Sequence, residues 1–191
     1  MRNMPSDLSG LQVLYKLKQV ERTTSVQKRK ESSAEHSWSC LILANYFLSI
    51  MKTKLNKVKV YELLLYHDVV EIEAGDVCIT KEEERKNKKE CERKAMEKLK
   101  KLIPPVLQRK LANLFLEFEE SSTPEAKFAN AVDKLDAVIQ ELDYRRDWKG
   151  WTEEFLRKKK EPYFKDFPEI NKMFEEATKM AREKGHFNRD L

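Results

Sequence analysis

The stretch YHDVVEIEAGD, residues 66–76, ends an apolar helical pattern in a cluster of polar side chains. From Val60 onward, apolar residues recur three and four positions apart, and His67 falls in that series. Gly75 is a natural stop, because glycine readily adopts the left-handed conformation that follows many helices. The pattern predicts a helix over 57–74 with an imidazole on its core-facing side.

Two carboxylates accompany this histidine. Asp68 follows His67 directly. Glu71 lies four residues after His67, which is one turn further along the same face of a continuous helix. A buried imidazole or carboxylate is costly unless it is paired or binds a metal ion. Either these are incidental polar positions, or this face of the helix needs them for chemistry.

Helical patterns occupy most of the remaining chain, and no long run alternates with period two. Two stretches have the spacing of a capping box: Ser32 followed by Glu35, and Thr80 followed by another glutamate. Thr123 is typical of an N-cap residue. Helices are expected over 7–20, 34–51, 57–74, 80–102, 105–119, 124–143, 148–160 and 168–184, with a polar, basic loop over 22–32. We predict an all-α bundle of about seven or eight helices.

The length of 191 residues fits one compact domain. No internal repeat or low-complexity linker divides the chain. We therefore expect a single domain with its core over about 7–143, and C-terminal helices over about 146–185 that pack on this core.

The charge pattern argues against a nucleic-acid interface. Charged residues make up 37% of the chain and the net charge is +5, but the basic runs are short. The longest charged stretch, 81–94, mixes both signs, as a solvated helix face does. The modest positive excess could still attract a small anion.

Cysteine usage and hydropathy predict a cytoplasmic protein. The three cysteines form no C-x-x-C pair, and an odd number does not fit a disulfide framework. The N-terminal residues lack a secretory signal, and the most apolar run, 38–50, is too short to cross a bilayer. We expect no membrane association.

Two further polar residues interrupt apolar helix faces. His36 is aligned with the buried face of its helix, and Asp133 borders another apolar stripe with alanines one turn to either side. Together with His67 and Asp68 they form a set of two imidazoles and two carboxylates from three helices. Such a set suits a first-row divalent ion in a bundle core. Taken singly, each residue also has an ordinary structural interpretation.

The order of the motifs is more specific than any one of them. ESSAEHS (31–37), HDVVEIEAGD (67–76), LANLFLEFEE (111–120) and TPEAKFANAVDKLDAVIQ (123–140) resemble the HD-domain metal-dependent phosphohydrolases. The likeness is best for the 5′-deoxynucleotidase branch and covers about residues 7–143. It implies an all-α, commonly dimeric enzyme, a homodimer or higher homo-oligomer, that requires a divalent ion such as Mn, Co, Zn, Fe, Ni or Mg.

The resemblance also implies roles for individual residues. The family's metal ligands fall on His36, His67, Asp68 and Asp133, and its substrate-binding positions fall on Arg22, Thr23, His36, Asp76 and Asp133. Glu71 matches a glutamate beside the metal-bound water, Asp76 an aspartate that faces the nucleotide, and Arg22 the residue that orients the phosphate. Asp68, Glu71 and Arg22 are therefore the expected catalytic residues.

The expected reaction is hydrolysis of a nucleoside 5′-monophosphate by attack of a metal-bound water. Two departures from the family concern the substrate rather than the metal. Thr23 stands where several bacterial members have tryptophan, and the segment 77–84 lacks a proline-bearing loop.

Two alternatives remain open. The same site could act on another nucleotide, namely a triphosphate, an alarmone or a cyclic nucleotide. The chain could also be a non-enzymatic helical interaction module with a structural metal ion.

Overall fold

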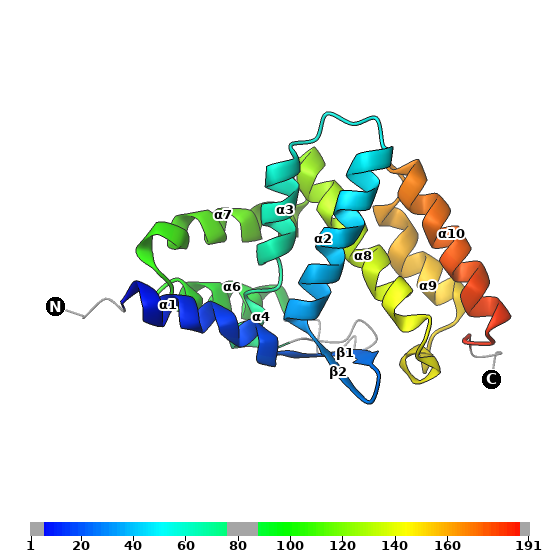
Figure 1. Ribbon diagram of the computed structural model, residues 1–191, viewed down its shortest axis with the longest axis horizontal. Coiled ribbons are helices and arrows are strands. Elements are labelled where there is room, and N and C mark those ends of the chain that lie inside the picture. Colours follow the sequence, from blue (N-terminus) through cyan, green and yellow to red (C-terminus); the bar gives the residue numbers. More distant parts are fainter. Residues whose placement is uncertain (1–5, 76–87, 188–191) are drawn as a thin grey trace.

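A computed structural model of the chain describes residues 6–75 and 88–187 (Figure 1). Its elements are α1 (Asp7–Leu14), η1 (Tyr15–Gln19), β1 (Glu21–Val26), β2 (Arg29–Ser32), α2 (Ser33–Ile50), α3 (Lys57–Tyr66), α4 (Glu71–Ala74), α6 (Lys88–Leu99), α7 (Pro105–Glu120), α8 (Pro124–Glu141), η2 (Arg145–Trp148), α9 (Glu153–Lys160), η3 (Glu161–Tyr163) and α10 (Pro168–Glu183). The predicted all-α class is confirmed, with one small hairpin added. Four of the helices, α2, α7, α8 and α10, lie where the sequence predicts them, to within two residues at each end.

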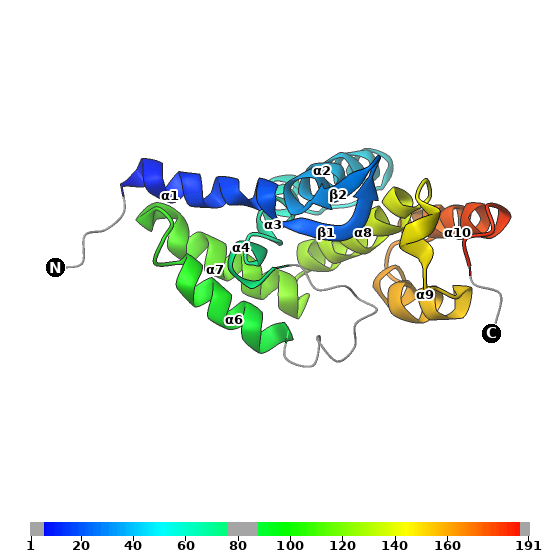
Figure 2. The ribbon, with the colours of Figure 1, turned by 90° about the horizontal axis from the view of Figure 1, so that it is seen from below.

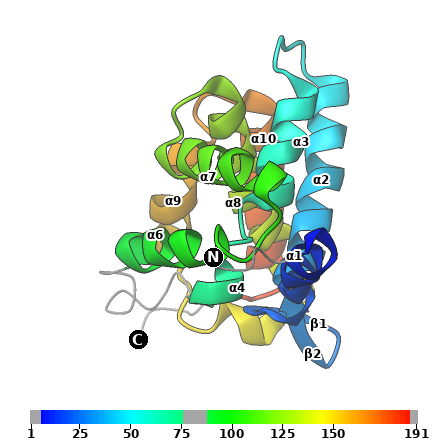
Figure 3. The same cartoon turned by 90° about the vertical axis from the view of Figure 1, so that its left-hand side faces the viewer.

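Helices α2, α3 and α8 pack together at the centre of the molecule (Figure 1). Helices α6 and α7 lie toward the N-terminal side, and α9 and α10 lie on the other side (Figures 1 and 2). Seen from the N-terminal side, α4 lies between α6 and the end of α1 (Figure 3). Within the described residues, no helix is long and apolar enough to cross a membrane.

The predicted caps of α2 and α8 are both present. Ser32 Oγ accepts the N–H of Glu35 at 3.3 Å, and a Glu35 carboxylate oxygen accepts the N–H of Ser32 at 2.9 Å. At the start of α8, Thr123 Oγ1 accepts the N–H of Ala126 at 3.2 Å. Each such cap stabilises a helix by about 1 kcal/mol. Both helices carry residues of the site described below.

The segment 22–32, predicted as a loop, instead forms most of an antiparallel hairpin. Val26 pairs with Arg29 across a two-residue turn, and Gln27 adopts a positive φ of 54° there. Hairpin turns require such backbone angles, but their usual glycine or asparagine is absent, so the turn has no clear sequence signal. The hairpin turns the side chain of Arg22 inward, where it is 13% exposed.

The helix predicted over 57–74 is broken between Tyr66 and Glu71. His67 Nδ1 donates to the carbonyl oxygen of Leu64 at 2.8 Å. The N–H of Glu71 bonds only three residues back, at 2.9 Å, which is tighter than α-helical spacing. His67 and Glu71 therefore lie on separate elements, not on one helix face.

Two other predicted helices are shorter than expected. The helix over 7–20 ends at Leu14 and continues as the 3₁₀ helix η1. The helix over 148–160 begins at Glu153, because Thr152 caps it by accepting the N–H of Phe155, three positions further on. A separate 3₁₀ turn, η2, precedes it.

The long charged helix predicted over 80–102 is described only from Lys88, as α6. Its proposed cap, Thr80, lies outside the described residues. The stop at Gly75 is confirmed, with a φ of 75° that suits glycine.

The apolar core consists of two clusters. One joins α2, α3 and α8 with α9 and α10, and the other joins η1, α4, α6 and α7. Tyr66 packs against both clusters, and His67 follows it directly. The end of α3 thus lies at the boundary between them.

Gly10 makes the close contact that seats α1 on the loop before α7. A Cβ atom at this buried position would lie 2.7 Å from Pro104 Cδ and 2.8 Å from Pro104 N. Because backbone atoms must then move, Gly10→Ala should lower the free energy of unfolding by about 1–3 kcal/mol. Urea denaturation would measure the change against Gln12→Ala, an exposed substitution on the same helix. Equal stability of the two variants would contradict the contact.

Candidate metal centre

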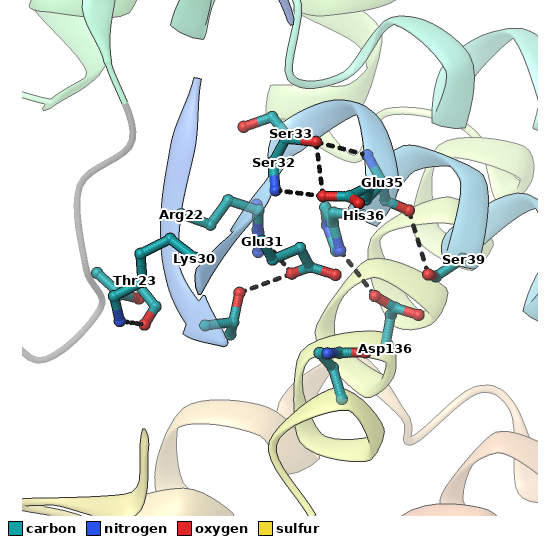
Figure 4. A network of polar contacts seen from close by, with 12 residues as sticks. Arg22, Thr23, Lys30, Glu31, Ser32, Ser33, Glu35, His36, Ser39 and Asp136 are labelled. Carbon is teal, nitrogen blue, oxygen red and sulfur yellow. Dashed lines mark hydrogen bonds and ion pairs between the residues drawn. The ribbon is translucent and has the colours of Figure 1, made fainter. Parts of the chain in front are cut away.

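His36 occupies the centre of the candidate site. Its ring is fully buried, and Nδ1 lies 2.7 Å from an Asp136 carboxylate oxygen of α8. Figure 4 shows His36 pointing from α2 toward that carboxylate. Its Nε2 lies 3.1 Å from Asp133 Oδ1 and 3.9 Å from Asp68 Oδ2. A carboxylate on Nδ1 favours the tautomer whose Nε2 lone pair can bind a metal ion.

The imidazole of His67 is oriented in the same way as that of His36, with Nδ1 as the hydrogen-bond donor. Its Nδ1 donates to the Leu64 carbonyl oxygen, so the Nε2 lone pair points the other way. This Nε2 is buried and has no hydrogen-bond partner within the described residues, although Asp68 Oδ1 lies 3.2 Å away at poor hydrogen-bonding geometry. The ring centroids of His36 and His67 are 5.3 Å apart. A bound cation would satisfy the orphaned nitrogen.

The two carboxylates complete a cluster of four donors. Asp68 Oδ2 accepts from Arg22 at 3.0 Å, and the second oxygen of Asp133 accepts from Lys134 Nζ. The structure therefore brings His36, His67, Asp68 and Asp133 together from α2, the turn after α3, and α8. This donor set fits a first-row divalent ion.

The electrostatics keep three of these donors in the form that binds metal. Burial alone raises the pKa of Asp133, but Lys134 and His36 outweigh burial and hold it well below its ordinary value. Burial likewise opposes ionisation of Asp68, yet the neighbouring His67 and Arg22 lower its pKa. Burial lowers the pKa of His67, which favours the neutral imidazole.

The pKa of His36 is shifted in the opposite direction to that of His67. Burial lowers its pKa, and so does the positive charge of Arg22. The neighbouring Cys40 and the carboxylates of Asp133 and Asp136 outweigh both, so the pKa lies well above its ordinary value. The surrounding negative charge thus favours the protonated imidazole of His36. A divalent ion at Nε2 could replace that proton.

Cys40 offers a different set of ligands. Its Sγ, with nitrogens of His36 and His67, forms a group of donors within 4.8 Å of one another. However, Sγ lies 3.6 Å from His36 Nε2, and burial raises the pKa of the thiol to about 12. A metal ligand must be deprotonated, and the carboxylates of Asp68 and Asp133 at the same site are more readily ionised than this thiol. The set of two imidazoles and two carboxylates is therefore better suited to bind a cation than the set that includes Cys40.

Arg22 and Glu71 lie next to these donors. β1 positions Arg22 between Asp68 and Glu31, with Nε 3.4 Å from a Glu31 oxygen. Glu71 is buried, and its carboxylate accepts a hydrogen bond from Ser33 Oγ at 2.7 Å. Ser33 starts α2, so the same capped turn orients both Glu71 and His36.

Two predicted substrate-binding residues are not placed at this centre. Thr23 is exposed on the hairpin, and its carbonyl oxygen accepts from Lys30. Asp76 lies outside the described residues. Both remain predictions.

The sequence reasoning assigned no role to Asp136, Glu31 or the nearby lysines. Asp136 had a detectable signal, because it follows Asp133 by three residues and therefore shares its helix face. Lys160 had none. It ends α9, is 5% exposed, and interacts electrostatically with the buried Glu141. Burial and the charge of Lys134 lower its pKa to about 8.

Comparison with known proteins identifies the family. The sequence matches the family described as HD domain over residues 14–171. The chain belongs to the HD-domain family. HD-domain relatives include the 5′-deoxynucleotidase HDDC2 of Bos taurus, 32% identical over 72% of this chain and 67% of the relative. Another is the 5′-deoxynucleotidase hdd1 of Schizosaccharomyces pombe, 31% identical over 73% of each chain.

Solved structures agree with this HD-domain assignment. A crystal structure from Magnetospirillum magnetotacticum MS-1, described as a predicted metal-dependent phosphohydrolase, has a TM-score of 0.82 and 28% identity. It covers 97% of this chain and 100% of its own. An HD-domain phosphohydrolase from Listeria innocua, at 23% identity and a TM-score of 0.63, supports the fold alone, covering 91% of this chain and 84% of its own.

Asp136 should control metal affinity without touching the metal. Asp136→Asn removes the anionic acceptor of His36 Nδ1–H, and such changes weaken metal binding about 10- to 100-fold. Isothermal titration with Mn²⁺ or Co²⁺ would measure the loss. Asp143→Asn is the control, because that side chain is exposed and ion-pairs with Lys184. Unchanged affinity in Asp136→Asn would contradict the proposed orientation of His36.

Proposed function

We propose that this HD-domain protein is a divalent-metal-dependent phosphatase of nucleoside 5′-monophosphates. The observation that carries the proposal is the convergence of two imidazoles and two carboxylates beside the guanidinium of Arg22. A metal site next to a fixed cation suits a phosphate group. The relatives named 5′-deoxynucleotidase support the nucleotide as substrate.

The ion would be held by His36, His67, Asp68 and Asp133. The orphaned Nε2 of His67 and the carboxylate behind His36 support this set. Mn, Co, Zn, Fe, Ni and Mg are all compatible with nitrogen and oxygen donors. When bound, the ion would supply Lewis acidity and lower the pKa of water.

The protein's own side chains would position the phosphate and move the proton. Arg22 presents donors that can bind phosphate oxygens while it holds Asp68. Glu71, oriented by Ser33, would accept the proton from the attacking water. Lys134 and Lys160 add positive charge near Asp133, which favours a dianionic ligand.

We also propose that the whole chain works as one HD domain, in the cytoplasm and as a homodimer. Residues of α9 and α10 share the first apolar cluster with α2 and α8, which supports one unit. Cys40 and Cys91 are free thiols, as expected in a reducing compartment.

Phosphate release from a panel of ribo- and deoxynucleotides, with each divalent metal in turn, tests this function. Asp68→Ala should lose both bound metal and turnover. Arg22→Ala should keep the metal but lose about 10²- to 10³-fold in turnover, because a preorganised donor to the phosphate is gone. Arg109→Ala, exposed on α7, is the charge-matched control. Full activity of Asp68→Ala would refute the site.

Lys160→Met tests whether the buried lysine contributes to phosphate binding. Loss of one charge-assisted hydrogen bond should raise KM about tenfold or more, while metal content stays unchanged. Lys158→Met removes the same charge from an exposed position on the same helix. Steady-state kinetics in which the two variants behave alike would exclude a role for Lys160.

A further inference from the structure

A hollow of about 220 Å³ lies between the end of α7, the first turns of α8, and η3 with the residues that follow it. It is smaller than the pockets of about 300–1,000 Å³ that hold drug-sized ligands, so it suits a group the size of one ring system. Its walls include Ser121, Lys127, Asn130, Pro162, Tyr163 and Phe167. We call it the Tyr163 hollow.

Asn130 presents a hydrogen-bond acceptor to the Tyr163 hollow. The residue is 7% exposed, and its Nδ2 donates to the carbonyl oxygens of Phe118 at 2.8 Å and Ala126 at 3.1 Å. Both amide hydrogens are thereby used, and no donor among the described residues bonds its Oδ1. Asn130 therefore offers an acceptor in a fixed orientation, and a ligand in the hollow would supply the donor.

Tyr163 contributes an aromatic ring to another wall of the hollow. The residue is 38% exposed, so part of it is open to a ligand. Aromatic side chains bind nucleobases by stacking, and every base has a π-face that can take part. A group that lies against this ring and also donates to Asn130 is flat and carries an N–H, as a nucleobase does.

Helix α8 connects the hollow to the metal centre. Asn130 lies one turn before Asp133, so the two side chains are neighbours on the helix surface. Lys134 Nζ donates to Asp133 and also lies 5.6 Å from the ring centroid of Tyr163. The side of the metal centre that Asp133 forms is thus separated from Tyr163 by a single side chain.

Phe118 makes a second connection, from the side of His67. Its ring centroid lies 5.1 Å from that of His67, and its carbonyl oxygen is one of the two acceptors that orient Asn130. Two of the proposed metal ligands therefore each lie one residue away from a wall of the hollow. A substrate whose phosphate is bound at the metal centre can place its other end there.

We propose that the Tyr163 hollow binds the base of the nucleotide, with Asn130 Oδ1 accepting a hydrogen bond from an exocyclic amino group and Tyr163 stacking on the ring. This inference rests on the proposed function and deepens it by naming the preferred bases. Adenine and cytosine carry such an amino group. Hypoxanthine and uracil have a carbonyl oxygen in its place, which would meet Oδ1 as a second acceptor.

Matched pairs of substrates test the hydrogen bond to Asn130 without any substitution. Deoxyadenosine 5′-monophosphate is compared with deoxyinosine 5′-monophosphate, and deoxycytidine 5′-monophosphate with deoxyuridine 5′-monophosphate. The amino-bearing member of each pair should have a kcat/KM about tenfold or more higher, because the other member leaves the buried acceptor unpaired. Equal kcat/KM values within both pairs would overturn the inference.

Tyr163→Leu tests the stacking. It should raise KM for deoxyadenosine 5′-monophosphate about tenfold, because the aromatic partner of the base is lost. Deoxyribose 5-phosphate has the same phosphate and sugar but no base, so its KM should not change. Tyr15→Leu is the matched control, since Tyr15 is 64% exposed on η1 and also has a lysine over its ring. A wild-type KM for the nucleotide in Tyr163→Leu, or an equal loss with both substrates, would show that no base binds here.

Binding of deoxyadenosine, which has no phosphate, separates this inference from the proposed function. Isothermal titration calorimetry should show that Tyr163→Leu binds this nucleoside about tenfold more weakly than the wild-type protein. This result in a protein that releases phosphate from no nucleotide would refute only the function. Nucleotide hydrolysis that depends neither on Tyr163 nor on the amino group would refute only the base site.

Discussion

The hydrogen bonds of His36 to two carboxylates of α8 are the constraint on which the site depends. Asp136 holds Nδ1 at 2.7 Å and Asp133 approaches Nε2 at 3.1 Å, all within a buried core. Removing one partner of such a buried pair typically costs 3–5 kcal/mol, because the other charge stays uncompensated. This pairing joins α2 to α8 in one orientation. The same geometry brings His36 Nε2, His67 Nε2 and the carboxylates of Asp68 and Asp133 together, in an arrangement that suits a cation.

The rest of the fold places the remaining groups around that pair. The break after α3 turns His67 inward and carries Glu71 back toward the first turn of α2, where Ser33 binds it at 2.7 Å. A continuous helix could not make both contacts in this way. The hairpin supplies Arg22, and Glu31 on its second strand holds that guanidinium on the side opposite Asp68. Irregular elements thus provide the parts of the site that regular helices do not reach.

Sequence patterns were sufficient for what depends on local chemistry. Ser32 and Thr123 mark helix starts through their own hydroxyl groups, and the polar His67 in an apolar series indicated a candidate site. The hairpin and the break at residues 67–70 were missed because both depend on tertiary contacts: a turn without glycine, and an imidazole that bonds the Leu64 carbonyl. The burial of Lys160 could not be predicted either, because nothing in a run of lysines distinguishes the one that is buried.

The optical spectrum of the Co²⁺-loaded protein tests the central claim most directly, because it reports both stoichiometry and ligand type. The account predicts one Co²⁺ per chain, with visible bands of nitrogen and oxygen ligands and no thiolate-to-cobalt charge-transfer band. A strong thiolate band that disappears in Cys40→Ser, or the absence of specific binding, would show that the four side chains do not hold the ion.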